Sequence, residues 1–140
     1  MVWGVFLVAK IIKHKHMKLR LKGNSVRLRL SQTDVEDLAV KGFVKEKINF
    51  SKDLALSYHL VAKSGTEKPV ISYAENTITV FISQHFTNDW PGNNVVNTSA
   101  LHTTEDGTEI FILIEKDFKC LDDTEEDQSD NFANPKLMKL

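Results

Sequence analysis

The chain has 140 residues, of which 41% are apolar, and it contains 18 Lys and Arg, 19 Asp and Glu, and a single Cys. This length fits one domain with one core. The composition excludes a disordered, collagen-like, disulfide-rich or multi-span membrane protein. The formal net charge of −1 names no partner by itself.

Charge is nevertheless segregated along the sequence. Residues 1–30 contain eight basic residues and no acidic one, whereas residues 115–130 contain eight acidic residues and two basic ones. A basic beginning and an acidic end either serve separate partners or neutralise each other within one molecule.

Residues 1–16 are expected to be a dispensable extension. The apolar run Val2–Ala9 is much shorter than the roughly 20 residues that span a bilayer, and its positive charges follow the run, whereas those of a signal peptide precede it. The alternative is a membrane-surface anchor at Val2–Ile12. One Cys excludes an intramolecular disulfide and gives no sign of secretion, so we expect a cytoplasmic protein.

The first half is predicted to form a hairpin, a helix and two strands. Apolar and basic residues alternate on both sides of Gly23-Asn24, which predicts a β-hairpin with Arg20 opposite Arg27. Ser31–Asp34 offers N-cap residues and Gly42 a stop for a short helix. Strands are then expected at Phe43–Phe50 and Leu54–Ala62.

The second half repeats this plan. A hairpin is predicted at Val70–Ala74 and Thr77–Ser83, followed by a helical turn that ends at Pro91-Gly92. Two further strands are expected at Val95–Thr103 and Glu109–Glu115. The segment that begins at Asn24 aligns with the segment that begins at Asn76, with every apolar position kept, so we predict an internal duplication.

These patterns predict an α+β fold in which two pseudo-repeated ββαββ units share one barrel-like antiparallel sheet core. The predicted domain spans residues 17–121, with halves at about 17–63 and 69–117. An extension at 1–16 precedes it, and an acidic tail at 122–140 follows it.

The first hairpin carries five basic residues on one face, and like charges directly opposite each other destabilise a sheet. Three interpretations remain open: a solvated face, neutralisation by the acidic tail, or binding of an anionic ligand such as nucleic acid or a phosphorylated compound. The second hairpin has no positive charge at the corresponding sites, so the fold does not require it. The candidate anion-binding residues are Lys18, Arg20, Lys22, Arg27 and Arg29.

The acidic tail is expected to be solvated, or to lie along the basic face. Phe118, Leu121 and Phe132 flank it and would fasten its ends to the body. The tail lacks the glycine and the ligand spacing of a standard calcium loop. The acidic residues proposed as internal partners are Asp122, Asp123, Glu125, Glu126, Asp127 and Asp130.

The chemistry-bearing residues form no recognised catalytic pattern. Cys120 would need a neighbouring base to act as a nucleophile. Glu115 and Asp117 lie two positions apart, which aims both at one face of a strand and makes an acid–base pair conceivable. No metal-ligand spacing and no nucleotide-binding glycine loop is present, so we expect no metal and no cofactor.

The segment from Met17 to Ser31, with Ile114–Leu121 and Asn134-Pro135, resembles a small uncharacterised bacterial family, a domain of unknown function, over Met17 to about Pro135. The resemblance implies a bacterial cytosolic domain and no catalytic residue. Three hypotheses follow: a non-catalytic interaction or regulatory module, an anion-binding module on the basic hairpin, or an enzyme that uses Cys120 or Glu115 and Asp117.

Overall fold

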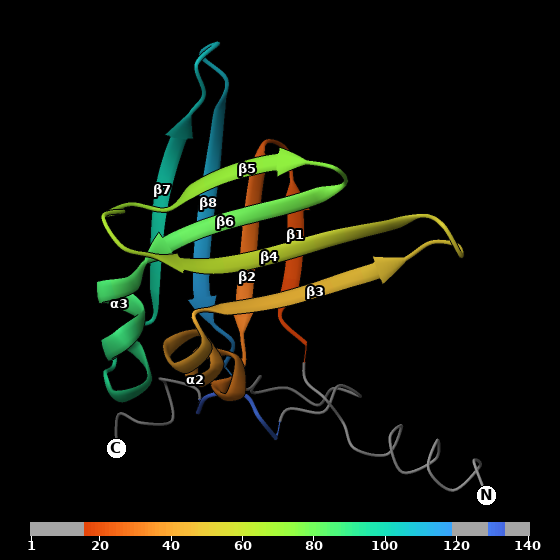
Figure 1. Ribbon diagram of the computed structural model, residues 1–140. Coiled ribbons are helices and arrows are strands. Elements are labelled where there is room, and N and C mark those ends of the chain that lie inside the picture. Colours follow the sequence, from red (N-terminus) through yellow and green to blue (C-terminus); the bar gives the residue numbers. More distant parts are fainter. Residues whose placement is uncertain (1–15, 119–128, 134–140) are drawn as a thin grey trace, which may run out of the picture.

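The computed structural model describes residues 16–118 and 129–133. Within these ranges the chain follows the order strand–strand–helix–strand–strand twice, with a short 3-10 helix in the second half (Figure 1). The elements are β1 (Lys18–Lys22), β2 (Ser25–Leu30), α2 (Gln32–Lys41), β3 (Phe43–Asn49), β4 (Ala55–Lys63), β5 (Val70–Ala74), β6 (Thr77–Ser83), α3 (Gln84–Asp89), η1 (Trp90–Gly92), β7 (Asn97–Thr103) and β8 (Glu109–Lys116).

The strands form two four-stranded sheets, which we call sheet A (β1-β2-β8-β7) and sheet B (β3-β4-β6-β5). The α+β class is therefore confirmed, whereas the single barrel-like antiparallel sheet does not form: the two sheets are not closed into a barrel. Each sheet combines two antiparallel hairpins through a central parallel pair, β2 with β8 and β4 with β6. Local alternation predicts the hairpins, but the parallel pairs join distant segments and leave no local pattern.

Both predicted hairpins have the expected register. In the first, Arg20 lies opposite Arg27 and Leu19 opposite Leu28. In the second, Glu75 and Asn76 occupy the turn with φ of 51° and 58°, which is typical of the two-residue turns that suit the twist of a hairpin. Since the register is fixed in the first hairpin, its apolar residues share one side and its basic residues the other.

The core lies between the two sheets, which cross each other in Figure 1. Alternating side chains of β2, β6 and β8 point inward, and α2 and η1 close one end of the sandwich with Leu38 and Trp90, both fully buried. The indole Nε1 of Trp90 donates to the carbonyl oxygen of Val95 at 2.7 Å, which satisfies its polar atom inside the core.

Helix α2 begins and ends at the predicted residues. The Ser31 hydroxyl accepts from the backbone N–H of Asp34, and the Asp34 carboxylate accepts from the backbone N–H of Ser31, which forms a capping box. Gly42 ends the helix with φ of 88°. Burial raises the pKa of Asp34 to about 6, against the lowering effect of the Ser31 hydrogen bonds.

The two halves have matching strand registers. Lys18 pairs with Arg29, and Val70 pairs with Phe81, 52 positions later in both strands. In the other hairpins, Phe43–Val61 corresponds to Asn97–Glu115, 54 positions later. The offset grows by two residues after the helices because the helix-to-strand connection is longer in the second half.

Candidate anion-binding face

The five basic residues of the first hairpin lie on the outer face of sheet A, opposite the core. We call this surface, which Lys18, Arg20, Lys22, Arg27 and Arg29 form, the basic face. On β2 the buried positions alternate with the half-buried arginines, because successive side chains in a strand point to opposite sides. The predicted set therefore shares one surface.

Two carboxylates from the C-terminal end of β8 bind three of these cations. The Arg27 guanidinium forms an ion pair with Glu115, with Nε donating to Oε1 at 2.7 Å. Arg29 Nε lies 3.3 Å from the same oxygen as a charge contact without hydrogen-bond geometry. This contact is possible because Arg29 and Glu115 are directly opposite each other in the parallel pair β2–β8.

The second carboxylate, Asp117, completes the cluster. Its Oδ1 lies 3.2 Å from Arg29 Nη2, and its Oδ2 lies 2.9 Å from Lys18 Nζ. The Asp117 side chain is only 4% exposed, and Arg29 and Lys18 are the charged partners that it contacts there. We call Lys18, Arg27, Arg29, Glu115 and Asp117 the ion-pair cluster. Internal carboxylates thus offset part of the repulsion within the hairpin.

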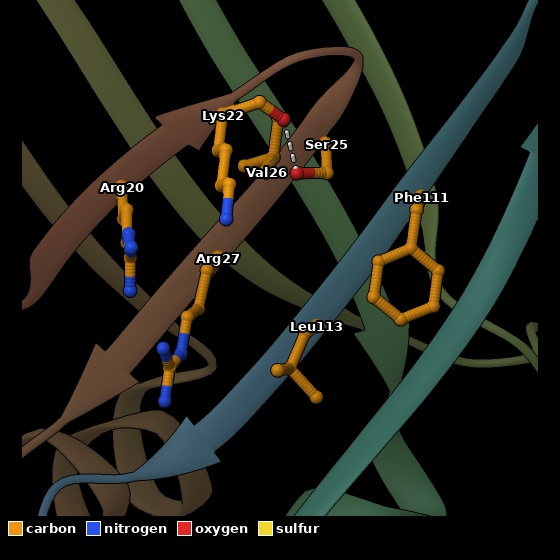
Figure 2. Close-up of a pocket in the computed structure, with 7 residues that line it drawn as sticks. All are labelled: Arg20, Lys22, Ser25, Val26, Arg27, Phe111 and Leu113. Carbon is orange, nitrogen blue, oxygen red and sulfur yellow. Dashed lines mark hydrogen bonds between the residues drawn. The ribbon is translucent and has the colours of Figure 1, made fainter.

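The other two basic residues have no such partner. Among residues 16–118 and 129–133, Arg20 and Lys22 form no ion pair. They line a concave surface that encloses a volume of about 230 Å³. The other lining residues are Ser25, Val26, Arg27, Phe111 and Leu113. Figure 2 shows the charged ends of Arg20, Lys22 and Arg27 gathered on one side of this surface, with Phe111 and Leu113 standing on β8.

Phe111 and Leu113 are the site residues that sequence reasoning missed. Within the hairpin itself no aromatic residue is interleaved with the basic ones, so the hairpin pattern alone gives no sign of a surface on which bases could stack. The parallel pairing of β2 with β8 brings Phe111 directly opposite Ser25, and its side chain is 43% exposed. The only hint in the sequence is that the apolar run Ile110–Ile114 has an aromatic residue at a position that alternation assigns to the outer face.

Neutralisation by the acidic tail is one of the three open interpretations. Within the described residues, the carboxylates that contact the basic face are Glu115 and Asp117. Asp130 is the one acidic tail residue within the described residues, and it lies at the N-terminus of α2. Its backbone oxygen accepts from the N–H of Gln32 at 3.0 Å, and its Oδ1 accepts from the N–H of Thr33 at 3.4 Å. A carboxylate here satisfies the free N–H groups of the helix end. The other proposed partners, Asp122, Asp123, Glu125, Glu126 and Asp127, lie outside the described residues.

The flanking aromatic residues behave as predicted. Phe118 and Phe132 form a parallel bridge, and their ring centroids are 5.7 Å apart. Lys116 lies between this pair and the core: Nζ donates to the carbonyl oxygen of Asn93 at 2.8 Å and sits 5.0 Å from the centre of the Phe132 ring. Burial lowers the pKa of Lys116. Leu121 lies outside the described residues.

The described residues place no recognised catalytic arrangement around the candidate residues. Cys120 lies outside the described residues. Glu115 and Asp117 do share one face, as predicted, and both are engaged by arginine or lysine. Within 16–118 and 129–133, no group of three or more His, Cys, Asp and Glu is placed to hold a metal ion. No helix in the same ranges has the length and apolarity needed to cross a membrane.

Comparison with protein families identifies the chain. Residues 17–136 match DUF7009, a family of unknown function. Because the match covers most of the sequence, the chain belongs to this family, and the resemblance to a domain of unknown function is confirmed. No curated protein and no solved structure matches the chain significantly.

Proposed function

We propose that this domain is a non-catalytic binding module that takes a phosphate-bearing anion on the basic face. The observation that carries the proposal is the position of Arg20 and Lys22: both border the concave surface beside Arg27, and neither forms an ion pair within residues 16–118 and 129–133. The three cations come from adjacent strands with fixed register, so their backbone positions are set before a ligand arrives.

Electrostatics supports this proposal. Arg20 lies directly across from Arg27, and a pair of like charges in this position costs stability. Glu115 offsets the charge of Arg27 and Arg29, whereas no carboxylate of the described residues pairs with Arg20 or Lys22. A bound anion would remove the remaining repulsion, so its binding is favoured by the ligand contacts and by relief within the protein.

The chemistry of the three side chains favours phosphate over a simple carboxylate. The planar guanidinium group of Arg20 presents paired N–H donors that match two phosphate oxygens. Arg27 directs Nε and Nη2 to Glu115 and keeps the N–H donors of Nη1 for a ligand. Lys22 adds a compact point charge at the rim. A multivalent phosphate can engage all three cations at once, whereas a single carboxylate satisfies one fork.

We infer an internal duplication as the origin of the two hairpins, and it supplies a comparison. At the positions of Arg20 and Arg27 the second hairpin has Ser72 and Thr79, which pair in the same register. Because only the first hairpin has arginine at these two positions, the fold does not require the arginines, which supports a role in binding. With the sequence resemblance, we place this module in the bacterial cytoplasm.

Calorimetric titration with tripolyphosphate at low salt tests the proposal. The wild-type chain should bind, and Arg20→Glu combined with Lys22→Glu should weaken binding at least tenfold, because two attractive charges become repulsive. The matched control is Lys45→Glu with Lys47→Glu, two exposed lysines of β3. Absence of binding by the wild-type chain, or an equal loss in the control, would overturn the proposal.

A further inference from the structure

We infer that the ligand of the basic face is single-stranded nucleic acid, with its phosphates on β1 and β2 and its bases on β8 and β7. This inference rests on the proposed function and adds a second chemical feature of the same surface: an exposed aromatic ring beside the cations. The ring is Phe111, which lines the concave surface together with Arg20 and Lys22.

The registers of sheet A divide its outer face into two strips. One row across the sheet runs Lys22, Ser25, Phe111, Leu101, and the next runs Arg20, Arg27, Leu113, Ser99. Both rows begin with basic residues on β1 or β2 and continue with an apolar residue on β8. Neighbouring strands are about 4.8 Å apart, so the cationic strip and the apolar strip run side by side along the strands.

The apolar strip is open to solvent. Phe111 is 43% exposed and Leu101 is 58% exposed, although both belong to interior positions of their strands. Large apolar side chains that stay exposed next to a charged strip indicate a binding surface. A ring on a sheet face can stack against a base while nearby cations hold the backbone, which is how open sheets bind single strands.

The shape of the surface favours a polymer over a small compound. The concavity of about 230 Å³ is smaller than the roughly 300–1,000 Å³ of typical small-molecule pockets, which enclose most of their ligand. An extended strand gains affinity from several shallow contacts in sequence. A duplex is disfavoured because its bases are stacked on each other and present no free face to Phe111.

The test measures fluorescence anisotropy of a labelled oligo(dT) of about 12 nucleotides, a length within the range that single-strand binding folds cover. Phe111→Leu keeps an apolar side chain and removes the ring. We expect this change to weaken oligo(dT) binding about tenfold, because stacking of one base contributes on that scale. Phe43→Leu is the matched control, since Phe43 is 42% exposed on the outer face of sheet B and should leave binding unchanged.

A second ligand separates stacking from charge. An abasic strand of equal length keeps the phosphates and lacks the bases, so wild type and Phe111→Leu should bind it equally. Three results would overturn this inference and leave the proposed function standing. They are equal affinity of wild type and Phe111→Leu for oligo(dT), equal affinity of wild type for a duplex and for oligo(dT), and binding of tripolyphosphate without binding of oligo(dT). Failure of the wild-type chain to bind tripolyphosphate would overturn the proposed function itself.

Discussion

The outer faces of the two sheets occupy equivalent positions, and one row of residues across them has opposite chemistry in the two sheets. In sheet A one row across four strands is charged or polar, and in sheet B the equivalent row is apolar. The row in sheet A consists of Lys18, Arg29, Glu115 and Asn97, and the row in sheet B consists of Val70, Phe81, Val61 and Phe43.

This difference shows that one backbone arrangement accepts two kinds of outer row. The apolar row is partly covered by lysines: Lys45 Nζ lies 4.8 Å from the centre of the Phe43 ring, and Lys63 Nζ lies 5.2 Å from that of Phe81. Both ammonium groups therefore lie over ring faces as cation–π contacts, which cover part of the exposed apolar surface. The fold therefore does not require ionic residues in this row, although sheet A has them.

The largest effect is expected from Asp117→Asn, which removes a buried charge from the ion-pair cluster. Lys18 and Arg29 would lose their shared partner, and breaking a buried ion pair costs about 3–5 kcal/mol. Urea unfolding should show this loss in the free energy of unfolding. Asp37→Asn is the control, because the Asp37–Lys41 pair is exposed and 3.7 Å apart and should contribute less than about 0.5 kcal/mol. Similar losses in both variants would show that the cluster does not stabilise sheet A.

A second variant makes sheet A resemble sheet B. Lys18→Val, Arg29→Phe and Glu115→Val install the apolar row, and Asp117→Asn avoids an unpaired buried carboxylate. We expect this quadruple variant to recover about 2 kcal/mol of the free energy lost in Asp117→Asn alone, since apolar packing can replace buried ion pairs. If the quadruple variant is less stable than the single variant, the two outer rows are not interchangeable.

A loss of stability with rising pH is expected from the N-terminus of α2 and not from that of α3, because α3 has Phe86 at the position that Asp34 takes in α2. The pKa of Asp34 is raised by burial from 3.8 to about 6, so the folded state binds this proton more tightly than the unfolded state. Stability should therefore fall as pH rises from about 4 to about 6, and then level off.

Urea midpoints measured from pH 4 to 7 check this expectation. Asp34→Asn should flatten the fall across that window, because the amide does not titrate and still accepts from Ser31. Asp37→Asn, on the same helix and partly exposed, should leave the slope unchanged. A slope that survives Asp34→Asn would assign the dependence to another group.

The smallest expected effect has the opposite sign. Arg20→Thr removes the like-charge pair with Arg27 and should raise the free energy of unfolding by about 0.2–0.5 kcal/mol, while it lowers the affinity for tripolyphosphate. Lys47→Thr is the control, because Lys47 lies opposite Ser57 and has no like charge across the strand. A destabilised Arg20→Thr chain would contradict the view that Arg20 is kept for binding.

Local patterns were sufficient to predict most of the secondary structure. Alternation fixes the register of the first hairpin, and Ser31 and Gly42 mark both ends of α2, because these signals act between neighbours in the chain. The sheet order could not be predicted, since the partners of Ser25 and Ser57 are Phe111 and Thr77 in parallel pairs. Such pairs depend on packing of the whole domain.

In the candidate site too, residues within one hairpin could be predicted and contacts between distant strands could not. The five basic residues were found from one hairpin, because their spacing alone places them on one face. Glu115 and Asp117 were recognised as sharing a face, yet their contact with Arg29 depends on the β2–β8 pair. Phe111 was missed for the same reason. The composition of a surface that spans distant strands is not readable from either segment by itself.

Hydrogen bonds hold residues 129–133 against the end of β8 and the N-terminal end of α2. Phe132 N–H donates to the Asp117 carbonyl at 2.8 Å, and Gln32 Nε2 donates to the Asn131 carbonyl at 3.0 Å. The covalent chain presents these contacts, together with those of Asp130 and of the Phe118–Phe132 pair, at an effective concentration on the order of millimolar. A protease cut between residues 118 and 129 would make the same contacts bimolecular. Dilution of the cut protein would then favour release of the C-terminal peptide, and with it the loss of the Asp130 partner at the N-terminus of α2.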